Sequence, residues 1–367
     1  MSLLRPAWII FECSDLPVQL GEEKLFLKGA IYMKCTSLPQ SWSFRVVLLS
    51  TLLLFSFLSS VQAEAPMVKT QVPGYYRMMV GQYEVTALYD GFVDMDVKLL
   101  KNASEKEVQV LLSRMFVGGP KLSAAVNAYL INTGSQLILV DAGAGKVFGP
   151  TLGGVIQNLK AAGCDPAQID AVMISHMHGD HVGGLLDGSG KPAFSNAVVY
   201  VSKGENDFWL SPAVAEIAPA EYKKYFKMAR DLAAPYVALG KWKTFGDGEM
   251  PVPGVKAVLI PGHTPGHTAY EVSDGKESLL ITGDMVHSLA VQFPRPDVAF
   301  EYDTDKKQAV SVRQALFKSI AERKVLVAGM HLPFPGIGRI RVDRNNAYTW
   351  VPVEYSPIRE SMGVTKY

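Results

Sequence analysis

The sequence predicts an α/β protein in which mixed β-sheets are covered by helices. Short apolar runs typical of strands alternate along the chain with segments that have helical spacing. Several of these runs are paired across short turns, which indicates antiparallel hairpins within the sheets. The chain has 367 residues, of which 48% are hydrophobic, so it is long and apolar enough to bury a large core.

Residues 1–63 are predicted to be a leader that is removed from the mature protein. Lys34 and Arg45 precede an apolar run at 46–58, and small residues follow this run up to Ala63. This order is typical of a secretory signal peptide, and the apolar run is too short for a comfortable membrane span. We therefore expect an exported protein, periplasmic or secreted, without stable membrane insertion after processing. The alternative is an uncleaved anchor.

Residues 64–74 are expected to be a flexible segment, and residues 75–367 to form one domain. Its strands are predicted from short runs that are apolar or alternate with polar residues, and its helices from apolar residues at helical spacing. In chain order, the expected strands are 83–88, 128–131, 136–140, 171–174, 197–201, 255–260, 268–272, 278–282, 324–328, 340–342 and 348–353. The expected helices are 152–162, 219–239 and 305–321, and residues 185–194 are expected to form a loop.

Charge argues against a nucleic-acid binder, and cysteine content argues against a protein stabilised by internal disulfides. Lys and Arg number 36 against 35 for Asp and Glu, which argues against a nucleic-acid binder because such proteins carry a basic excess. Once the leader is removed, Cys164 is the one cysteine left, so no internal disulfide can form. We expect Cys164 to be a small buried residue rather than a nucleophile.

The histidines indicate the chemistry, because all seven fall in or beside short polar motifs. The central motif is a His-x-His-x-Asp-His run at residues 176–181. Gly-His-Thr-Pro-Gly-His follows at 262–267, Gly-Asp-Met-Val-His at 283–287 and Gly-Met-His at 329–331. Imidazole nitrogens and carboxylate oxygens suit zinc and similar divalent metals.

The central motif can supply ligands to two adjacent ions. His176 and His178 directly follow a predicted strand, and in an extended backbone residues two apart point the same way, so both imidazoles can bind one ion. Asp180 and His181 come after Gly179, which lets the chain turn toward a second ion nearby.

Later motifs complete the two predicted sites. His267 would give the first ion its third nitrogen, His331 would join the second ion, and Asp284 is the carboxylate placed to bridge both. His263 is expected to stabilise its turn or to hydrogen-bond to a ligand, and His287 to line the pocket, to hydrogen-bond to a ligand or to shuttle a proton. The seven expected ligands are His176, His178, Asp180, His181, His267, Asp284 and His331.

This arrangement predicts hydrolytic chemistry. Two divalent ions about 3.5–4 Å apart can share a water, lower its pKa toward neutrality and polarise the attacked carbonyl or phosphoryl oxygen. The expected nucleophile is therefore a metal-bridging hydroxide, with Asp284 and Asp180 as the catalytic carboxylates. Asp180 would orient the hydroxide and relay a proton, or act as a ligand only.

In order and spacing, these seven residues resemble the dinuclear pattern of the metallo-β-lactamase superfamily, and the resemblance covers most of residues 75–355. It implies an αββα sandwich of two mixed sheets covered by helices, with the metals at one edge. It also implies that Asp141, in Leu-Val-Asp-Ala-Gly, is a structural aspartate that holds the histidine loop by hydrogen bonds.

A narrower resemblance is to the methyl parathion hydrolase group and its lactone-cleaving relatives. The segments that resemble this group are 73–78, 148–153, 178–184, 290–293 and the tail His-Leu-Pro-Phe-Pro-Gly-Ile-Gly at 331–338. The resemblance implies a homodimer and an aromatic leaving-group pocket, formed here by Phe148, Trp209 and Phe226.

The chain departs from the organophosphate hydrolases of this group, which carry an apolar residue at the position of His287 and a basic one near Leu100. We therefore expect a hydrolase with two divalent ions, zinc by default, that opens small-molecule lactones or cleaves aryl esters. The alternatives are hydrolysis of organophosphate triesters, a β-lactamase, a thioesterase like glyoxalase II, and a non-catalytic metal-binding protein. Nucleic acid is not an expected substrate.

Overall fold

The computed structural model of the chain describes residues 65–358. The predicted leader, residues 1–63, lies outside the described residues. Residues 65–74 have no regular secondary structure, and residues 70–358 belong to one compact unit that begins with strand β1 at Tyr75–Val80. None of the helices in residues 65–358 has both the length and the apolar character needed to cross a membrane.

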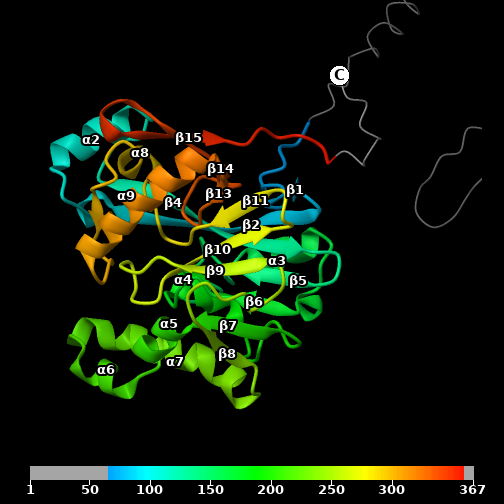
Figure 1. The fold of residues 1–367 in the computed structure, drawn as a ribbon. Helices are drawn as coiled ribbons and strands as arrows, with labels where there is room; N and C mark the ends of the chain where they lie inside the picture. The colour runs from blue at the N-terminus through cyan, green and yellow to red at the C-terminus, as the bar shows by residue number, and fades with distance from the viewer. Residues whose placement is uncertain (1–64, 359–367) are drawn as a thin grey trace, which may run out of the picture. The chain divides into compact units, whose positions relative to one another are not determined.

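Two large sheets form the centre of this unit (Figure 1). The first sheet has the strand order β1-β2-β4-β5-β6-β7-β8, and the second has the order β15-β14-β13-β11-β10-β9. The strands of the first sheet after β1 are β2 (Tyr83–Asp96), β4 (Lys121–Asn132), β5 (Leu137–Val140), β6 (Ala171–Met173), β7 (Val198–Ser202) and β8 (Trp242–Phe245). Those of the second are β9 (Val255–Leu259), β10 (Thr268–Ser273), β11 (Ser278–Ile281), β13 (Leu326–Ala328), β14 (Ile337–Val342) and β15 (Tyr348–Pro352). Strands β3 (Leu100–Lys101) and β12 (Ala299–Phe300) pair separately.

Both sheets are mixed, as the sequence predicted. In the first sheet β1, β2, β4 and β5 pair antiparallel, whereas β5 to β8 run parallel. In the second, β11 and β13 are parallel and the other pairs are antiparallel. Short turns join the antiparallel pairs β1–β2, β4–β5 and β10–β11, and connections that contain helices join the parallel pairs β5–β6, β7–β8 and β11–β13.

Helices cover the outer faces of the two sheets. They are α2 (Glu105–Ser113), α3 (Val155–Ala161), α4 (Gly179–Val182), α5 (Lys203–Trp209), α6 (Pro212–Ile217), α7 (Ala220–Ala238), α8 (Leu289–Gln292) and α9 (Lys306–Arg323). Figure 1 shows α5 and α7 beside β7 and β8, and α9 beside β14.

Successive side chains of a strand point alternately to the core between the two sheets and to the helices outside them. Ile138 and Val140 of β5 pack into the core between the two sheets, whereas Leu139 packs outward with residues of α3 and α7. Likewise Ile281 of β11 faces the inner core and Leu280 packs outward against residues of α9. Side chains two apart share a face of a strand. The predicted αββα sandwich is therefore confirmed.

Strand ends position the polar motifs. Asp141 follows β5, the histidine run at 175–181 follows β6, and the loop at 260–267 joins β9 to β10. Asp284 follows β11, and His331 follows β13. These segments are far apart in sequence but meet at one edge of the sandwich.

At Gly184, just after the histidine run, the backbone packs closely against the loop after β5. A Cβ on Gly184 would overlap the carbonyl oxygen of Ala142, in the loop after β5. The amide of Ala142 donates to the carbonyl of His181 at 2.8 Å, so this loop and the histidine run are joined. Only a residue without a side chain fits between them.

We expect Gly184→Ala to lower the free energy of unfolding by about 1–3 kcal/mol, because the added methyl group must push two packed backbones apart. Gly118→Ala is the matched control: no atom lies within 4 Å of a Cβ built there, so its stability should change by less than about 0.5 kcal/mol. Denaturant unfolding measures both, and equal midpoints for the two variants would contradict the packing argument.

Candidate metal centre

Four side chains form a first group of nitrogen and oxygen donors. His176, His178, His263 and Asp284 each place one such atom within 4.8 Å of all the others. Nδ1 of His178 lies 3.0 Å from Nε2 of His176 and 3.0 Å from Nε2 of His263. Oδ2 of Asp284 lies 3.5 Å and 3.3 Å from the same two Nε2 atoms. These donors come from three different strand ends.

A second group lies beside the first and shares Asp284 with it. Oδ2 of Asp180 is 3.5 Å from Nε2 of His181 and 3.5 Å from Nε2 of His331. Oδ1 of Asp284 lies 3.2 Å from Nε2 of His181, and Oδ2 lies 3.1 Å from Nε2 of His331. The structure therefore places Asp284 between the two groups.

The third imidazole of the first group differs from the sequence-based expectation. The prediction named His267, but the structure brings His263 into the group instead. Nε2 of His267 accepts a hydrogen bond from the backbone amide of Asp284 at 3.0 Å, so its lone pair is already used. His267 supports the bridging carboxylate through its backbone, and we assign the donor position to His263.

The donor set fits two divalent cations. Nε2 of His181 and Oδ1 of Asp284 are buried, and among the described residues neither has a hydrogen-bond partner. Such atoms are rare in native proteins unless an ion or water satisfies them. Burial lowers the pKa of His178 to about 3, which keeps its imidazole neutral and able to bind a metal. Burial also opposes charge on His331, but the nearby carboxylate of Asp284 leaves its pKa raised.

In three of the imidazoles, those of His181, His263 and His331, the nitrogen that faces away from the donors is held by another segment. Nδ1 of His181 donates to Oδ2 of Asp141, and Nδ1 of His263 to Oδ1 of Asp303, both at 2.8 Å. Nδ1 of His331 donates to the carbonyl of Ala125 at 2.8 Å. These bonds fix the tautomer and the orientation of the three rings, so that the Nε2 atom of each points at the centre.

Asp141 contacts the histidine run through both of its carboxylate oxygens. Its Oδ1 accepts the amide of Ser175 at 2.7 Å, and its Oδ2 accepts the Ser175 hydroxyl at 2.6 Å as well as the His181 imidazole. Asp141 has φ of 59°, a left-handed conformation that is uncommon for residues other than glycine. The hydrogen bonds to the histidine run offset that backbone strain.

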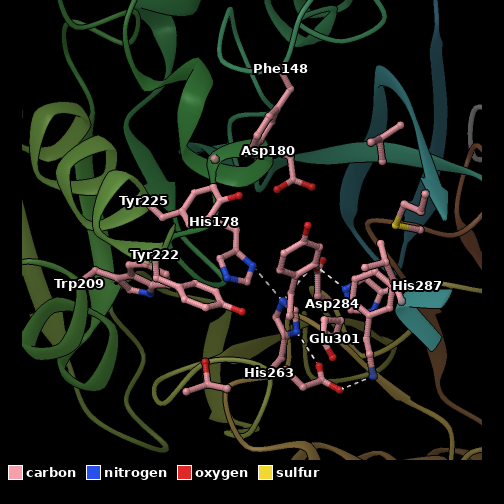
Figure 2. A pocket seen from close by; sticks show the side chains of 18 of the residues that line it. Phe148, His178, Asp180, Trp209, Tyr222, Tyr225, His263, Asp284, His287 and Glu301 are labelled. Carbon is pink, nitrogen blue, oxygen red and sulfur yellow. Dashed lines mark hydrogen bonds and ion pairs between the residues drawn. The ribbon is translucent and has the colours of Figure 1, made fainter. Parts of the chain in front are cut away.

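A cavity of about 680 Å³ opens onto the donors (Figure 2). The four predicted pocket residues all line it: Phe148, Trp209, Phe226 and His287. The ring of Trp209 lies 5.5 Å from that of His178 and 4.8 Å from that of Phe226. Tyr222 and Tyr225, which lie in the segment expected to be a helix at 219–239, also line the cavity.

His287 forms the wall beside Asp284. Its ring stacks on Phe300 at 4.0 Å, and its Nε2 lies 3.1 Å from Oδ2 of Asp284. Burial lowers the pKa of His287 to about 4, so the ring is neutral near pH 7. A neutral imidazole that contacts Asp284 donates a hydrogen bond to it.

Two carboxylates of the centre were missed by the sequence reasoning. Asp303 orients His263, and Glu205 is buried beneath the histidine run, where its Oε2 accepts the amide of Met177 at 2.9 Å. Neither residue lies in a histidine motif, so residue spacing offered no signal for them.

Negatively charged side chains outnumber positively charged ones on the cavity wall. Carboxylates line it at Asp94, Asp96 and Glu301 in addition to those at the centre. Lys306 is the one lysine or arginine among the described lining residues. Its Nζ lies 3.0 Å from the carbonyl oxygen of Glu301 and 3.5 Å from Oε2 of the same residue, so its charge is already partnered.

Comparison with known proteins agrees with this geometry. The sequence profile of the metallo-beta-lactamase superfamily matches residues 124–318. The crystal structure of hydrolase AbOPH, described as in the beta lactamase superfamily, is 39% identical, with a TM-score of 0.76 over 78% of this chain and 100% of that one. AidC, a dizinc quorum-quenching lactonase, is 28% identical, with a TM-score of 0.72 over 77% and 99% of the two chains.

Among curated sequences, the N-acyl homoserine lactonase AttM of Agrobacterium fabrum is 28% identical over 148 residues, which cover 37% of this chain and 48% of that protein. A β-lactamase-like protein 2 homologue of Drosophila melanogaster is 28% identical over 162 residues, which cover 44% and 46%. The chain thus spans about half the length of these curated relatives.

The two histidines of the Gly-His-Thr-Pro-Gly-His motif should differ in their effect on metal content. His263→Ala removes a donor of the first group, so the purified protein should retain about one zinc per chain where the unmodified protein holds two. His267→Ala removes only the acceptor of an amide hydrogen bond, so it should keep both ions with reduced stability. Elemental analysis after gel filtration measures this, and the reverse pattern would return the donor role to His267.

Proposed function

The chain belongs to the metallo-β-lactamase superfamily, and we propose that it is a metal-dependent hydrolase that opens lactones. One observation supports this above all: two adjacent donor groups share the carboxylate of Asp284 at the base of a largely apolar cavity. Such a pair of sites suits hydrolysis without a side-chain nucleophile.

We assign the first ion to His176, His178 and His263, and the second to Asp180, His181 and His331, with Asp284 shared. Zinc is supported by the nitrogen-rich donor set and by the dizinc lactonase among the similar structures. When bound, the two ions would polarise the substrate carbonyl and lower the pKa of a water.

The side chains of this protein orient the reactants and move the proton. Asp180 is one of the donors that line the cavity, as Figure 2 shows, and its side chain is 18% exposed. Its carboxylate can accept a hydrogen bond from the attacking water and take up its proton. His287 contacts Oδ2 of Asp284 and keeps that carboxylate from turning away. Trp209 and Phe226 exclude bulk water from the wall beside His178.

The cavity favours uncharged substrates with apolar substituents. Its wall is aromatic and aliphatic, and its one cationic side chain among the described residues, Lys306, already contacts Glu301. A β-lactam antibiotic carries a carboxylate, which would meet Asp94, Asp96 and Glu301 without a free cationic side chain. An N-acyl lactone is neutral and carries an apolar chain, so lactone opening fits this wall better than β-lactam hydrolysis.

Aryl-ester cleavage is a second candidate, and the aromatic cluster favours it. Phe226 and Trp209 lie 4.8 Å apart and tilted, which leaves ring faces and edges for an aryl leaving group. The same centre could act on a phosphotriester, so a substrate panel must include all three classes.

We expect the zinc-loaded protein to hydrolyse N-acyl homoserine lactones and dihydrocoumarin faster than methyl parathion, and to turn over nitrocefin hardly at all. A chelator should abolish the activity, and zinc should restore it. Asp284→Ala removes the shared donor and should lower kcat at least about a hundredfold. A preparation with two zinc ions per chain that hydrolyses no lactone or aryl ester would overturn the proposal.

Helix α6 should bind the acyl chain of the substrate. Val214, Ile217 and Ala218 extend the apolar wall away from the metal centre, and Ile217 is 85% exposed although it lines the cavity. An exposed isoleucine beside a cavity can become buried by a bound alkyl chain.

Ile217→Ser should therefore raise KM for N-decanoyl homoserine lactone about fivefold, which corresponds to about 1 kcal/mol of lost apolar contact. KM for the butanoyl substrate should change less, because its chain ends before α6. Leu239→Ser is the matched control, since Leu239 is 58% exposed and does not line the cavity. Equal effects of Ile217→Ser on both substrates would place the acyl chain elsewhere.

A further inference from the structure

Glu205 is a fully buried carboxylate that is not among the metal donors. It lies in the first turn of α5, its exposed fraction is 0%, and no lysine or arginine contacts it in the described residues. Charged side chains are almost never fully buried unless they are partnered. A glutamate in this position therefore needs an explanation from its surroundings.

Three N–H donors surround the carboxylate. Oε2 accepts the backbone amide of Met177 at 2.9 Å and the indole Nε1 of Trp209 at 2.8 Å. Oε1 accepts the backbone amide of Gly266 at 2.8 Å. These hydrogen bonds use the side chain as an acceptor, which is the role of an ionised carboxylate. Burial raises the pKa of Glu205, and the side chain of Thr264 and the amides of Met177 and Gly266 oppose that rise.

The three donors belong to the segments that build the metal centre and its pocket. Met177 stands between the donor residues His176 and His178. Gly266 lies in the loop that carries His263. Trp209 forms the pocket wall, and its ring lies 5.5 Å from that of His178. One carboxylate thus contacts both donor-bearing loops and the wall of the cavity.

Packing leaves little freedom around these contacts. The hydroxyl of Ser202 donates to the carbonyl of Gly266 at 2.6 Å and accepts the amide of Glu205 at 3.2 Å. A Cβ on Gly266 would overlap both Ser202 Oγ and the Glu205 amide. The loop of His263 therefore packs directly against the start of α5, and Glu205 can fix its position closely.

We propose that Glu205 is a positioning residue that aligns the His176–His178 segment, the loop of His263 and the ring of Trp209. It sets the affinity of the first ion site and the shape of the pocket wall beside it. This inference rests on the proposed function, because it takes His176, His178 and His263 as ligands of one ion. The competing explanation is that Glu205 only stabilises the fold.

The test compares Glu205→Gln with the unmodified protein. Glutamine has the same shape but one acceptor oxygen, and its NH₂ group would face an N–H donor instead of accepting from it. We expect the zinc affinity of the first site to fall about 10–100-fold. The visible absorption spectrum of the cobalt-substituted protein should change, and KM should rise for aryl lactones.

Two further variants separate positioning from stability. Glu322→Gln removes an exposed carboxylate on α9 and should leave zinc affinity, spectrum and KM unchanged. Trp209→Phe removes the Nε1 donor and should raise KM for aryl lactones while zinc affinity stays within about twofold. In the double variant Glu205→Gln/Trp209→Phe, KM should differ at least about twofold from the product of the two single effects, because the residues share one hydrogen bond.

The possible outcomes are distinct. If Glu205→Gln only lowers the melting temperature, and its folded form keeps the zinc affinity, the cobalt spectrum and KM, then Glu205 is structural and the inference is overturned. If Glu205→Gln does not fold, an unchanged KM in Trp209→Phe overturns it instead. Failure of the unmodified protein to bind two ions or to hydrolyse lactones would refute the proposed function, which is a separate result.

Discussion

The position of the Asp284 carboxylate is the constraint on which the rest of the site depends. It is 4% exposed, and its oxygens lie 3.1–3.5 Å from imidazole nitrogens of both donor groups. An unpartnered carboxylate so deeply buried would cost several kcal/mol. Surrounding imidazoles, and cations in the loaded protein, must therefore offset that cost. The ends of β6, β11 and β13 have to meet at one point for this to happen, and the two sheets pack so that they do.

A second layer of polar groups makes these strand ends interdependent. Asp141 ties the end of β5 to His181 at the end of β6. Asp303 ties His263 to the chain segment just before α9. Glu205 ties the start of α5 to both donor-bearing loops. Because His181, His263 and His331 are each oriented by a residue from a different part of the chain, a shift in one strand end would misplace donors on another. The geometry of the centre is thus a property of the whole sandwich.

Much of this site could be predicted from the sequence where local backbone geometry decides the answer. A His-x-His pair directly after a strand projects two imidazoles to one side, and the structure places His176 and His178 in one group. The third imidazole could not be predicted in this way. His263 and His267 lie four residues apart in one turn, and spacing alone does not say which ring faces the centre. A tertiary contact determines which ring faces the centre: the backbone amide of Asp284 donates to Nε2 of His267, so His263 is the ring that faces the other donors.

The roles of residues whose partners are distant in sequence could not be predicted for the same reason. Ser202 and Glu205 have the spacing of a helix capping box, a local pattern in which the glutamate would bond to the backbone at the start of its own helix. Ser202 does cap the helix, but the Glu205 carboxylate turns inward to amides 28 and 61 residues away. Local pattern and tertiary structure compete for the same side chain here. The tertiary contacts prevail, because the buried amides of Met177 and Gly266 would otherwise lack an acceptor.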